Sequence, residues 1–117
     1  MLIESVRLER WLADASADAT LREEARAWSA LICLRSGAEE VRLSFKDGVL
    51  GKGAGDSTPA AIILEGDPAA WAEVFGGLSL NRAVRELKIG VKGNVREAMK
   101  NWRTLWLLFE LAHQGGE

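Results

Sequence analysis

The sequence predicts an α+β fold that combines helices with five short strands, and three patterns carry that prediction. Residues 41–46 alternate apolar and polar side chains and end at Asp47-Gly48. This indicates a β-hairpin, because both central positions of a type I′ turn need a positive φ. Asp67-Pro68 marks a helix start, with Asp as N-cap and Pro at the first helical position. Residues 94–113 carry apolar side chains at helical spacing.

The first half of the chain is expected to form one helix and then three strands. Residues 2–19 have the spacing of an amphipathic helix. Residues 27–34 are apolar on both alternating sides, a pattern shared by helices and strands, and their length and β-branching favour a strand buried on both faces. A turn at Ser36-Gly37 leads into the alternating strand over residues 41–46. The third strand is expected from residue 49 to about residue 54.

The second half begins with a turn over residues 55–58 and a fourth strand over residues 59–65. The helix that starts at Asp67 is expected to end at Gly76-Gly77. A short helical piece and a fifth strand follow, and Asn94 is expected to cap the last helix. The predicted ranges are 81–85 for the short piece and 87–92 for the strand.

No linker, repeat or low-complexity segment interrupts the sequence, so we expect residues 1–117 to form a single domain. Its parts are an N-terminal helix over residues 2–19, a sheet with inserted helices over residues 25–92 and a C-terminal helix over residues 94–113. A chain of 117 residues, 48% of them hydrophobic, is long enough to bury a core without a metal ion or a disulfide.

The composition favours a cytoplasmic protein. The single Cys cannot form an internal disulfide. Charged residues interrupt the first eleven positions, and the longest later apolar run covers only residues 105–109. We therefore expect neither a secretory signal nor a membrane span.

Charge is unevenly distributed, although the formal net charge is only −2. That near-neutral balance argues against a protein that binds nucleic acid over its whole surface. Residues 82–103 contain seven basic and two acidic side chains, so the remainder of the chain is strongly acidic. The basic segment fits either a solvated helix face or contact with an anionic partner, including transient contact with a membrane surface.

Three segments, taken in order, resemble the sterol carrier protein two family of lipid-binding domains. They are SFKDGVLG over residues 44–51, AAIILEGDPAAWAEVFGG over residues 60–77 and LKIGVKGN over residues 87–94. The similarity extends over about residues 25–110, nearly the whole chain. The family often has Asp where Asn94 stands and Gly where Glu86 stands.

The resemblance implies a five-stranded, mostly antiparallel sheet with helices packed on one face and an apolar tunnel between them. Members of the family that this sequence resembles bind sterols, fatty acids or acyl-CoA esters without transforming them. The resemblance therefore implies non-catalytic binding or transfer of a lipid, sterol, fatty acyl or other hydrophobic ligand, with no cofactor.

Large apolar side chains supply candidates for the wall of such a cavity. The sequence has five Trp and three Phe but no Tyr, a set that suits either a bulky core or an apolar cavity. On the C-terminal helix the apolar stripe is expected to face the sheet. The candidate ligand-binding residues on this helix and the preceding one are Trp71, Phe75, Leu78, Met99, Trp102 and Trp106. For each of them a purely structural place in the core explains the sequence equally well.

Catalytic and metal-binding patterns are weak, and we expect neither function. The one histidine, His113, falls in the last turn of the final helix, where the helix dipole favours a cation. Cys33 lies in the most apolar strand, which indicates a small core residue. The glycine-rich residues 51–56 lack the Gly-Lys-Ser/Thr of a phosphate loop and lead into a strand, which indicates a strand end or a bulge.

Leu107 and Leu111 project toward the charged side of the last helix and should be covered. The cover could be a second copy in a twofold homodimer, the N-terminal helix through Trp11 and Leu12, or a membrane. This keeps a second functional hypothesis open. In it the protein is an interaction module or accessory subunit, a homodimer or the partner of an enzyme, whose tunnel is a filled core.

Overall fold

The structure of the protein is a computed structural model that describes residues 2–53 and 59–114. The helices are α1 (Ser5–Ala17), α2 (Ala19–Glu24), α3 (Pro68–Phe75), α4 (Leu80–Arg85), α5 (Val95–Lys100) and α6 (Trp102–Gln114). The strands are β1 (Ala30–Ser36), β2 (Glu39–Lys46), β3 (Val49–Lys52), β4 (Ile62–Gly66) and β5 (Ile89–Gly93). The expected turn over residues 55–58 and the expected end of the third strand at residue 54 lie outside the described residues.

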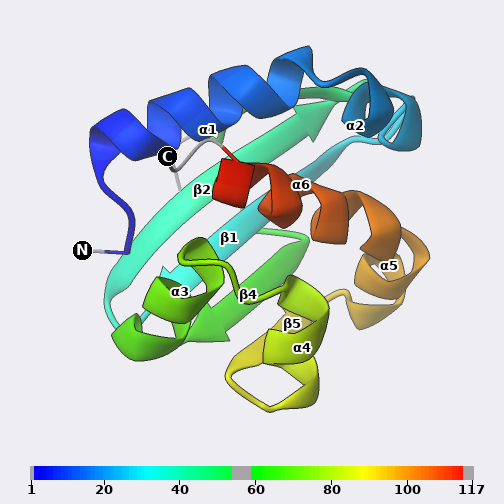
Figure 1. The fold of residues 1–117 in the computed structure, drawn as a ribbon. Helices are drawn as coiled ribbons and strands as arrows, with labels where there is room; N and C mark the ends of the chain where they lie inside the picture. The colour runs from blue at the N-terminus through cyan, green and yellow to red at the C-terminus, as the bar shows by residue number, and fades with distance from the viewer. Residues whose placement is uncertain (1, 54–58, 115–117) are drawn as a thin grey trace.

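The strands form one five-stranded sheet in the order β3-β2-β1-β4-β5, and the helices cover one face of it (Figure 1). Strand pairs are antiparallel, except that β1 and β4 run parallel with Ile32 opposite Ile62. The central strand β1 is buried on both sides, since Ile32, Cys33 and Leu34 are at most 1% exposed. The expected mostly antiparallel α+β sheet is confirmed.

The predicted hairpin joins β2 to β3. Asp47 and Gly48 have φ of 52° and 81°, the positive values that a type I′ turn requires. Leu43 and Phe45 point into the core with 0% and 2% exposure. Val41 on the same face is half-buried. The strand therefore keeps the register that its alternating pattern predicts.

The helix predicted over residues 94–113 is divided, and α2 follows the predicted N-terminal helix as a helix that was not predicted. Asp18 has extended backbone angles and accepts a hydrogen bond from the Leu21 N–H at 2.9 Å, so it ends α1 and caps α2. Asn101, with φ −111° and ψ 24°, ends α5, and α6 begins at the next residue. Periodicity does not reveal these breaks, because each occupies a single residue between two helices.

The turns and caps between the strands follow the expected chemistry. The Asp67 carboxylate accepts the Ala70 N–H at 2.7 Å, and Pro68 opens α3. Gly93 has φ 84°, and a Cβ there would lie 2.6 Å from the Ala61 carbonyl oxygen. Glycine therefore allows β5 to pass closely beside the start of β4 and to deliver the chain to α5.

Candidate functional site

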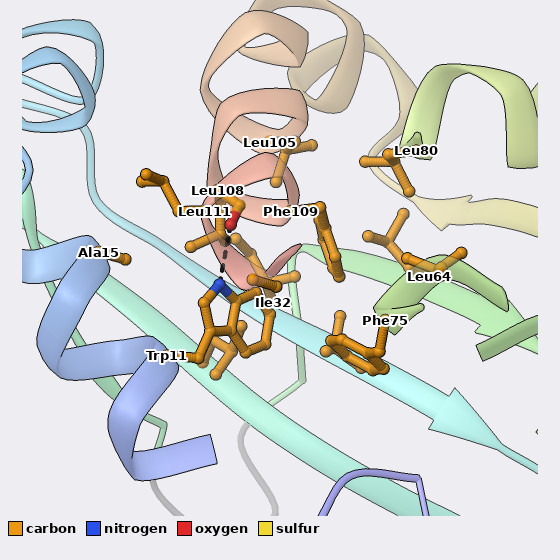
Figure 2. Packing of buried hydrophobic residues seen from close by; sticks show 14 of the residues in the cluster. Trp11, Ala15, Ile32, Leu64, Phe75, Leu80, Leu105, Leu108, Phe109 and Leu111 are labelled. Atoms are coloured by element: carbon orange, nitrogen blue, oxygen red, sulfur yellow. Dashed lines mark hydrogen bonds between the residues drawn. The ribbon is translucent and has the colours of Figure 1, made fainter. Parts of the chain in front are cut away.

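An aromatic cluster lies between the helices and the inner face of the sheet. It consists of Trp11 from α1, Trp71 and Phe75 from α3, and Phe109 from α6, each at most 4% exposed. Trp11 has its ring centre 5.4 Å from that of Phe75 and 5.2 Å from that of Phe109. The Trp71 ring lies 5.8 Å from Phe75 and 6.0 Å from Phe109. Figure 2 shows Trp11 reaching from α1 toward α6, with Phe75 and Phe109 facing each other beyond it.

The polar atoms of the two indoles are occupied at the edges of the cluster. The Trp11 Nε1–H donates to the Leu108 carbonyl at 2.8 Å (Figure 2), and the Trp71 Nε1–H donates to the Arg35 carbonyl at 2.9 Å. With these donors satisfied, the cluster presents apolar ring surface to its surroundings. Such a surface suits contact with a hydrophobic molecule.

Aliphatic side chains of the sheet complete the apolar layer beneath the rings. Five of them, from β1, β2 and β4, have 0% exposure: Ile32, Leu34, Leu43, Ile62 and Leu64. Leucines of α6 extend the same layer (Figure 2). A tunnel was expected between the sheet and the helices. Between α1, α3 and α6, that space is occupied by rings that contact one another.

Two surface grooves open at opposite ends of α1. The groove at its C-terminal end has a volume of about 110 Å³, and Leu21, Phe45 and Leu50 contribute to its lining. The groove at its N-terminal end has a volume of about 330 Å³, and its lining includes Arg7 and Phe75. Since Phe75 also belongs to the aromatic cluster, the second groove lies directly against that cluster.

Arg7 joins the N-terminal groove to α3. Its guanidinium donates to the Phe75 carbonyl and stands over the Phe75 ring, 5.6 Å from the ring centre. Its Nε is buried and lacks a hydrogen-bond partner within the part of the chain that the structure describes. The side chain therefore fastens α1 to the last turn of α3 through a carbonyl and a cation–π contact.

The structure separates the predicted ligand-binding residues into two groups. Trp71 and Phe75 lie in the aromatic cluster, and Leu78 is half-buried against the core. Met99 is 49% exposed on α5. Trp102 and Trp106 are partly exposed and line a groove of about 340 Å³ that is open to the surface.

The cause of this separation is the rotation of the C-terminal helices. Their buried face carries Ala98, Leu105, Leu108, Phe109 and Ala112. The apolar stripe expected from the sequence contained some of these residues and also Met99, Trp102 and Trp106. In the structure those three side chains lie beside the buried face. A helical wheel fixes the relative angles of side chains but leaves open which angle the sheet and the other helices cover.

Trp11 and Phe109 are the cluster members that were not nominated from the sequence as ligand-binding residues. Trp11 stands in the apolar stripe of the N-terminal helix, and from the sequence it was considered only as a possible cover for Leu107 and Leu111. The available signal was a Trp at the centre of an amphipathic helix, a residue whose N–H needs an acceptor when it is buried.

Leu107 and Leu111 are covered within the chain. Leu111 is 6% exposed and belongs to the core cluster, while Leu107 is half-buried against it. Both α1 and α2 contact α6. The contacts include the bond from Trp11 to Leu108 and a bond from the Thr104 hydroxyl to the Glu24 carbonyl at 3.2 Å.

The remaining titratable candidates occupy structural places. Burial, with a smaller effect of Glu40, raises the pKa of the Cys33 thiol, which keeps it protonated at neutral pH. His113 Nε2 lies 2.6 Å from the Val74 carbonyl at the end of α3. Among the described residues, no group of three His, Cys, Asp or Glu side chains could hold a metal ion. No described helix is long and apolar enough to span a bilayer.

Solved structures with the same fold extend over nearly the whole chain. A crystal structure of sterol carrier protein 2 has a TM-score of 0.76 at 18% identity and covers 97% of each chain. A conserved hypothetical protein of Thermus thermophilus, described as possibly a sterol carrier protein, has a TM-score of 0.71 at 19% identity and covers 98% of this chain and 90% of its own. The ubiquinone synthesis protein UbiJ-SCP2 has a TM-score of 0.62 at 11% identity, with 89% of this chain and 90% of its own covered.

The TM-scores show that these proteins share the fold of this chain, and at such low sequence identities the likeness shows the fold alone. A search of curated protein sequences finds no match to the chain. The model of the SCP-2 sterol transfer family matches residues 8–105, which include most of α1, every strand and the helices between them. With most of its length matched by that family and its sheet arranged as in sterol carrier protein 2, the chain belongs to the SCP-2 sterol transfer family.

Proposed function

We propose that the protein is a non-catalytic carrier that binds a lipid, sterol, fatty acyl or other hydrophobic molecule between the inner face of the sheet and α1, α3 and α6. The observation that carries this proposal is the aromatic cluster, whose indole N–H groups are bonded to backbone carbonyls at its edges. Membership of a sterol transfer family supports the same class of ligand. Trp71 and Phe75 are the residues expected to contact the ligand, joined by Trp11 and Phe109.

Binding requires the rings to make room, and an outward shift of α1 is one movement that would provide it. Within the described residues, the side chains of α1 hold the helix to the rest of the fold through three donated bonds to backbone carbonyls. These run from Trp11 to Leu108, from Ser16 to Leu50 and from Arg7 to Phe75. An outward shift of α1 would connect the two grooves at its ends with the aromatic cluster, so a ligand could enter at either groove.

The experiment is a titration of the delipidated protein with a fluorescent fatty acid or sterol analogue, followed by displacement with unlabelled lipid. Binding should quench Trp emission, and Phe75→Leu should weaken it while preserving much of the buried volume. The matched control is Trp106→Phe, which alters an aromatic outside the cluster and should leave affinity unchanged. Folded protein that binds neither analogue at micromolar concentration would contradict the proposal.

The second candidate is an interaction module, either a homodimer or an accessory subunit of an enzyme. The observation that favours it is the mutual contact of the four rings, which fill the space in which a tunnel was expected. Cover of Leu107 and Leu111 by α1 and α2 counts against a homodimer through that face. Native mass spectrometry of the protein as purified separates the candidates, because it reports the mass of a bound ligand and the number of chains together.

We also infer that the carrier acts in the cytoplasm without a cofactor. The free thiol of Cys33, buried in the central strand, fits a reducing compartment. No described polar constellation supports an acid, a base or a nucleophile next to the aromatic cluster, since the indole donors are bonded to backbone and the Cys33 thiol is held in its protonated form.

A further inference from the structure

A stripe of apolar side chains lies on the surface of α5 and the first turns of α6. Val95 is 46% exposed, Met99 is 49% exposed, and Trp102 and Trp106 are partly exposed. Val95 and Met99 are four residues apart on α5, and Trp102 and Trp106 are four residues apart on α6, so each pair shares one face of its helix. We call this set the surface stripe.

The surface stripe adjoins a groove between α6 and α4. Trp102 donates its indole N–H to the Asn81 side-chain oxygen, which fixes the ring beside α4. Trp102, Trp106, Asn81 and Arg103 line the groove, whose volume is about 340 Å³. Figure 1 shows α4 and α5 at the same end of the molecule, beside the edge strand β5. An apolar surface of this kind, with two indoles at its centre, is typical of a contact site.

Cations flank the surface stripe on its solvent side. Arg96 and Lys100 each follow a stripe residue of α5 by one position, and Arg103 follows Trp102 on α6, which places each cation about 100° around its own helix from the stripe. Arg103 pairs with Glu24 at 2.7 Å, whereas Arg96 and Lys100 form no ion pair within the part of the chain that the structure describes. The nearby acid, Glu97, turns inward and accepts the Trp28 N–H at 3.2 Å. The flank therefore presents positive charge that the described residues leave uncompensated.

We propose that the surface stripe and its cationic flank dock the protein on an anionic membrane surface. Indoles prefer the headgroup level of a bilayer, aliphatic side chains such as Met99 and Val95 prefer its acyl boundary, and Lys and Arg are attracted to anionic headgroups. The combination of all three on one edge matches that environment. The docking function is separate from ligand binding, since the surface stripe is open to solvent, whereas the four rings of the aromatic cluster are each at most 4% exposed.

Charge also argues against a second copy as the occupant. A twofold contact through the surface stripe would bring the two Arg96 and Lys100 pairs toward each other. Like charges held at an interface repel, and the structure offers no carboxylate on the exposed side of α5 to offset them. An anionic bilayer instead pairs each cation with a headgroup.

The test is co-sedimentation of the full chain with two kinds of vesicle. One kind is phosphatidylcholine alone, and in the other a third of the lipid is phosphatidylglycerol. We expect binding to the anionic vesicles, little binding to the neutral ones, and weaker binding as salt is raised. Arg96→Gln/Lys100→Gln should weaken the partition coefficient at least about tenfold, because each cation contributes separately. Met99→Ser should weaken it as well.

Matched controls change equally exposed residues elsewhere. Arg10→Gln/Lys46→Gln removes the same amount of charge, and Val6→Ser alters an apolar residue that is 69% exposed on α1. Both should leave the partition coefficient unchanged, and fluorescent-ligand binding in solution should be unchanged in every variant. Three outcomes would overturn the proposal: equal binding to both vesicle types, an equal loss in the control variants, or no vesicle binding together with a dimer that Met99→Glu dissociates.

Discussion

The aromatic cluster and the surface stripe each contain two tryptophans, yet their surroundings differ. Trp11 and Trp71 are at most 1% exposed, and each donates its N–H to a backbone carbonyl of another element. Trp102 is partly exposed and donates to the side chain of Asn81, which is itself exposed. A tryptophan becomes a core residue where neighbouring elements supply both cover and a fixed acceptor. Where neighbouring elements cover only one side of the ring, the other side stays exposed and can contact a partner.

The largest expected effect contrasts one tryptophan of each group. Trp71→Ala should lower the free energy of unfolding by about 3–5 kcal/mol, because it leaves a cavity among the rings of Phe75 and Phe109. Trp106→Ala should lower it by less than about 1.5 kcal/mol, since part of that ring already faces water. Urea denaturation followed by circular dichroism measures both. Similar losses in the two variants would erase the distinction between the cluster and the stripe.

Two leucines give a second comparison between a buried and an exposed side chain. Leu111→Glu places a carboxylate where the native side chain is 6% exposed, and should cost more than about 2 kcal/mol. Leu87→Glu changes a side chain that is 89% exposed, and should cost less than about 0.5 kcal/mol. Light scattering of the wild type tests the explanation. A dimer that Leu111→Glu splits into folded monomers would show that a second copy, rather than α1 and α2, covers this face.

A smaller effect on stability is expected from removing the hydrogen bond between Trp11 and the Leu108 carbonyl. Trp11→Phe keeps an aromatic ring but removes the N–H that bonds the Leu108 carbonyl at 2.8 Å. Loss of this buried bond, together with the smaller ring, should lower the free energy of unfolding by about 1–3 kcal/mol. Trp102→Phe removes a bond to the exposed Asn81 side chain, for which water substitutes, and the loss should stay below about 1 kcal/mol. Chemical denaturation of the two variants in parallel gives the comparison, and a larger loss in Trp102→Phe would reverse it.

The smallest expected effect is a pH dependence that belongs to the surface. Hydrogen bonds from Arg82 and Lys92 lower the pKa of Glu86 and Glu65, respectively, below the ordinary value of 4.5. Each carboxylate thus contributes stability that is fully present above its unfolded pKa and is lost as pH falls through its folded pKa. Thermal melts between neutral pH and about pH 3 should show this loss, reduced in Glu86→Gln and in high salt. An unaltered pH profile in Glu86→Gln would assign the dependence to other groups.

Local features of the sequence predicted most of the secondary structure. The hairpin at Asp47-Gly48, the cap at Asp67 and the cap at Asn94 each depend on a few neighbouring residues, and each is present. The start of the first strand was predicted three residues early, because Ala27 adopts φ 65° in the turn after α2. The helix predicted over residues 94–113 is broken at Asn101, whose side chain bonds the Glu97 carbonyl. The short helix α2, which Asp18 caps, was not predicted.

The candidate site was only partly predictable. Trp71 and Phe75 were nominated on their own helix, and both lie in the cluster. Trp11 joins them from a part of the sequence about sixty residues away, and no local pattern links the two positions. Met99, Trp102 and Trp106 share the helical spacing of the buried residues, so their partial exposure could not be recognised from spacing.

The sequence by itself determined where helices, strands and turns form, because capping, β-alternation and positive φ act within a few residues. It also determined that the chain is rich in tryptophan and that cations gather in residues 82–103. Only the tertiary structure decided which tryptophans are core and which are surface. That choice depends on which side of α6 packs against α1, α3 and the sheet, and a periodic pattern is the same whichever side is covered.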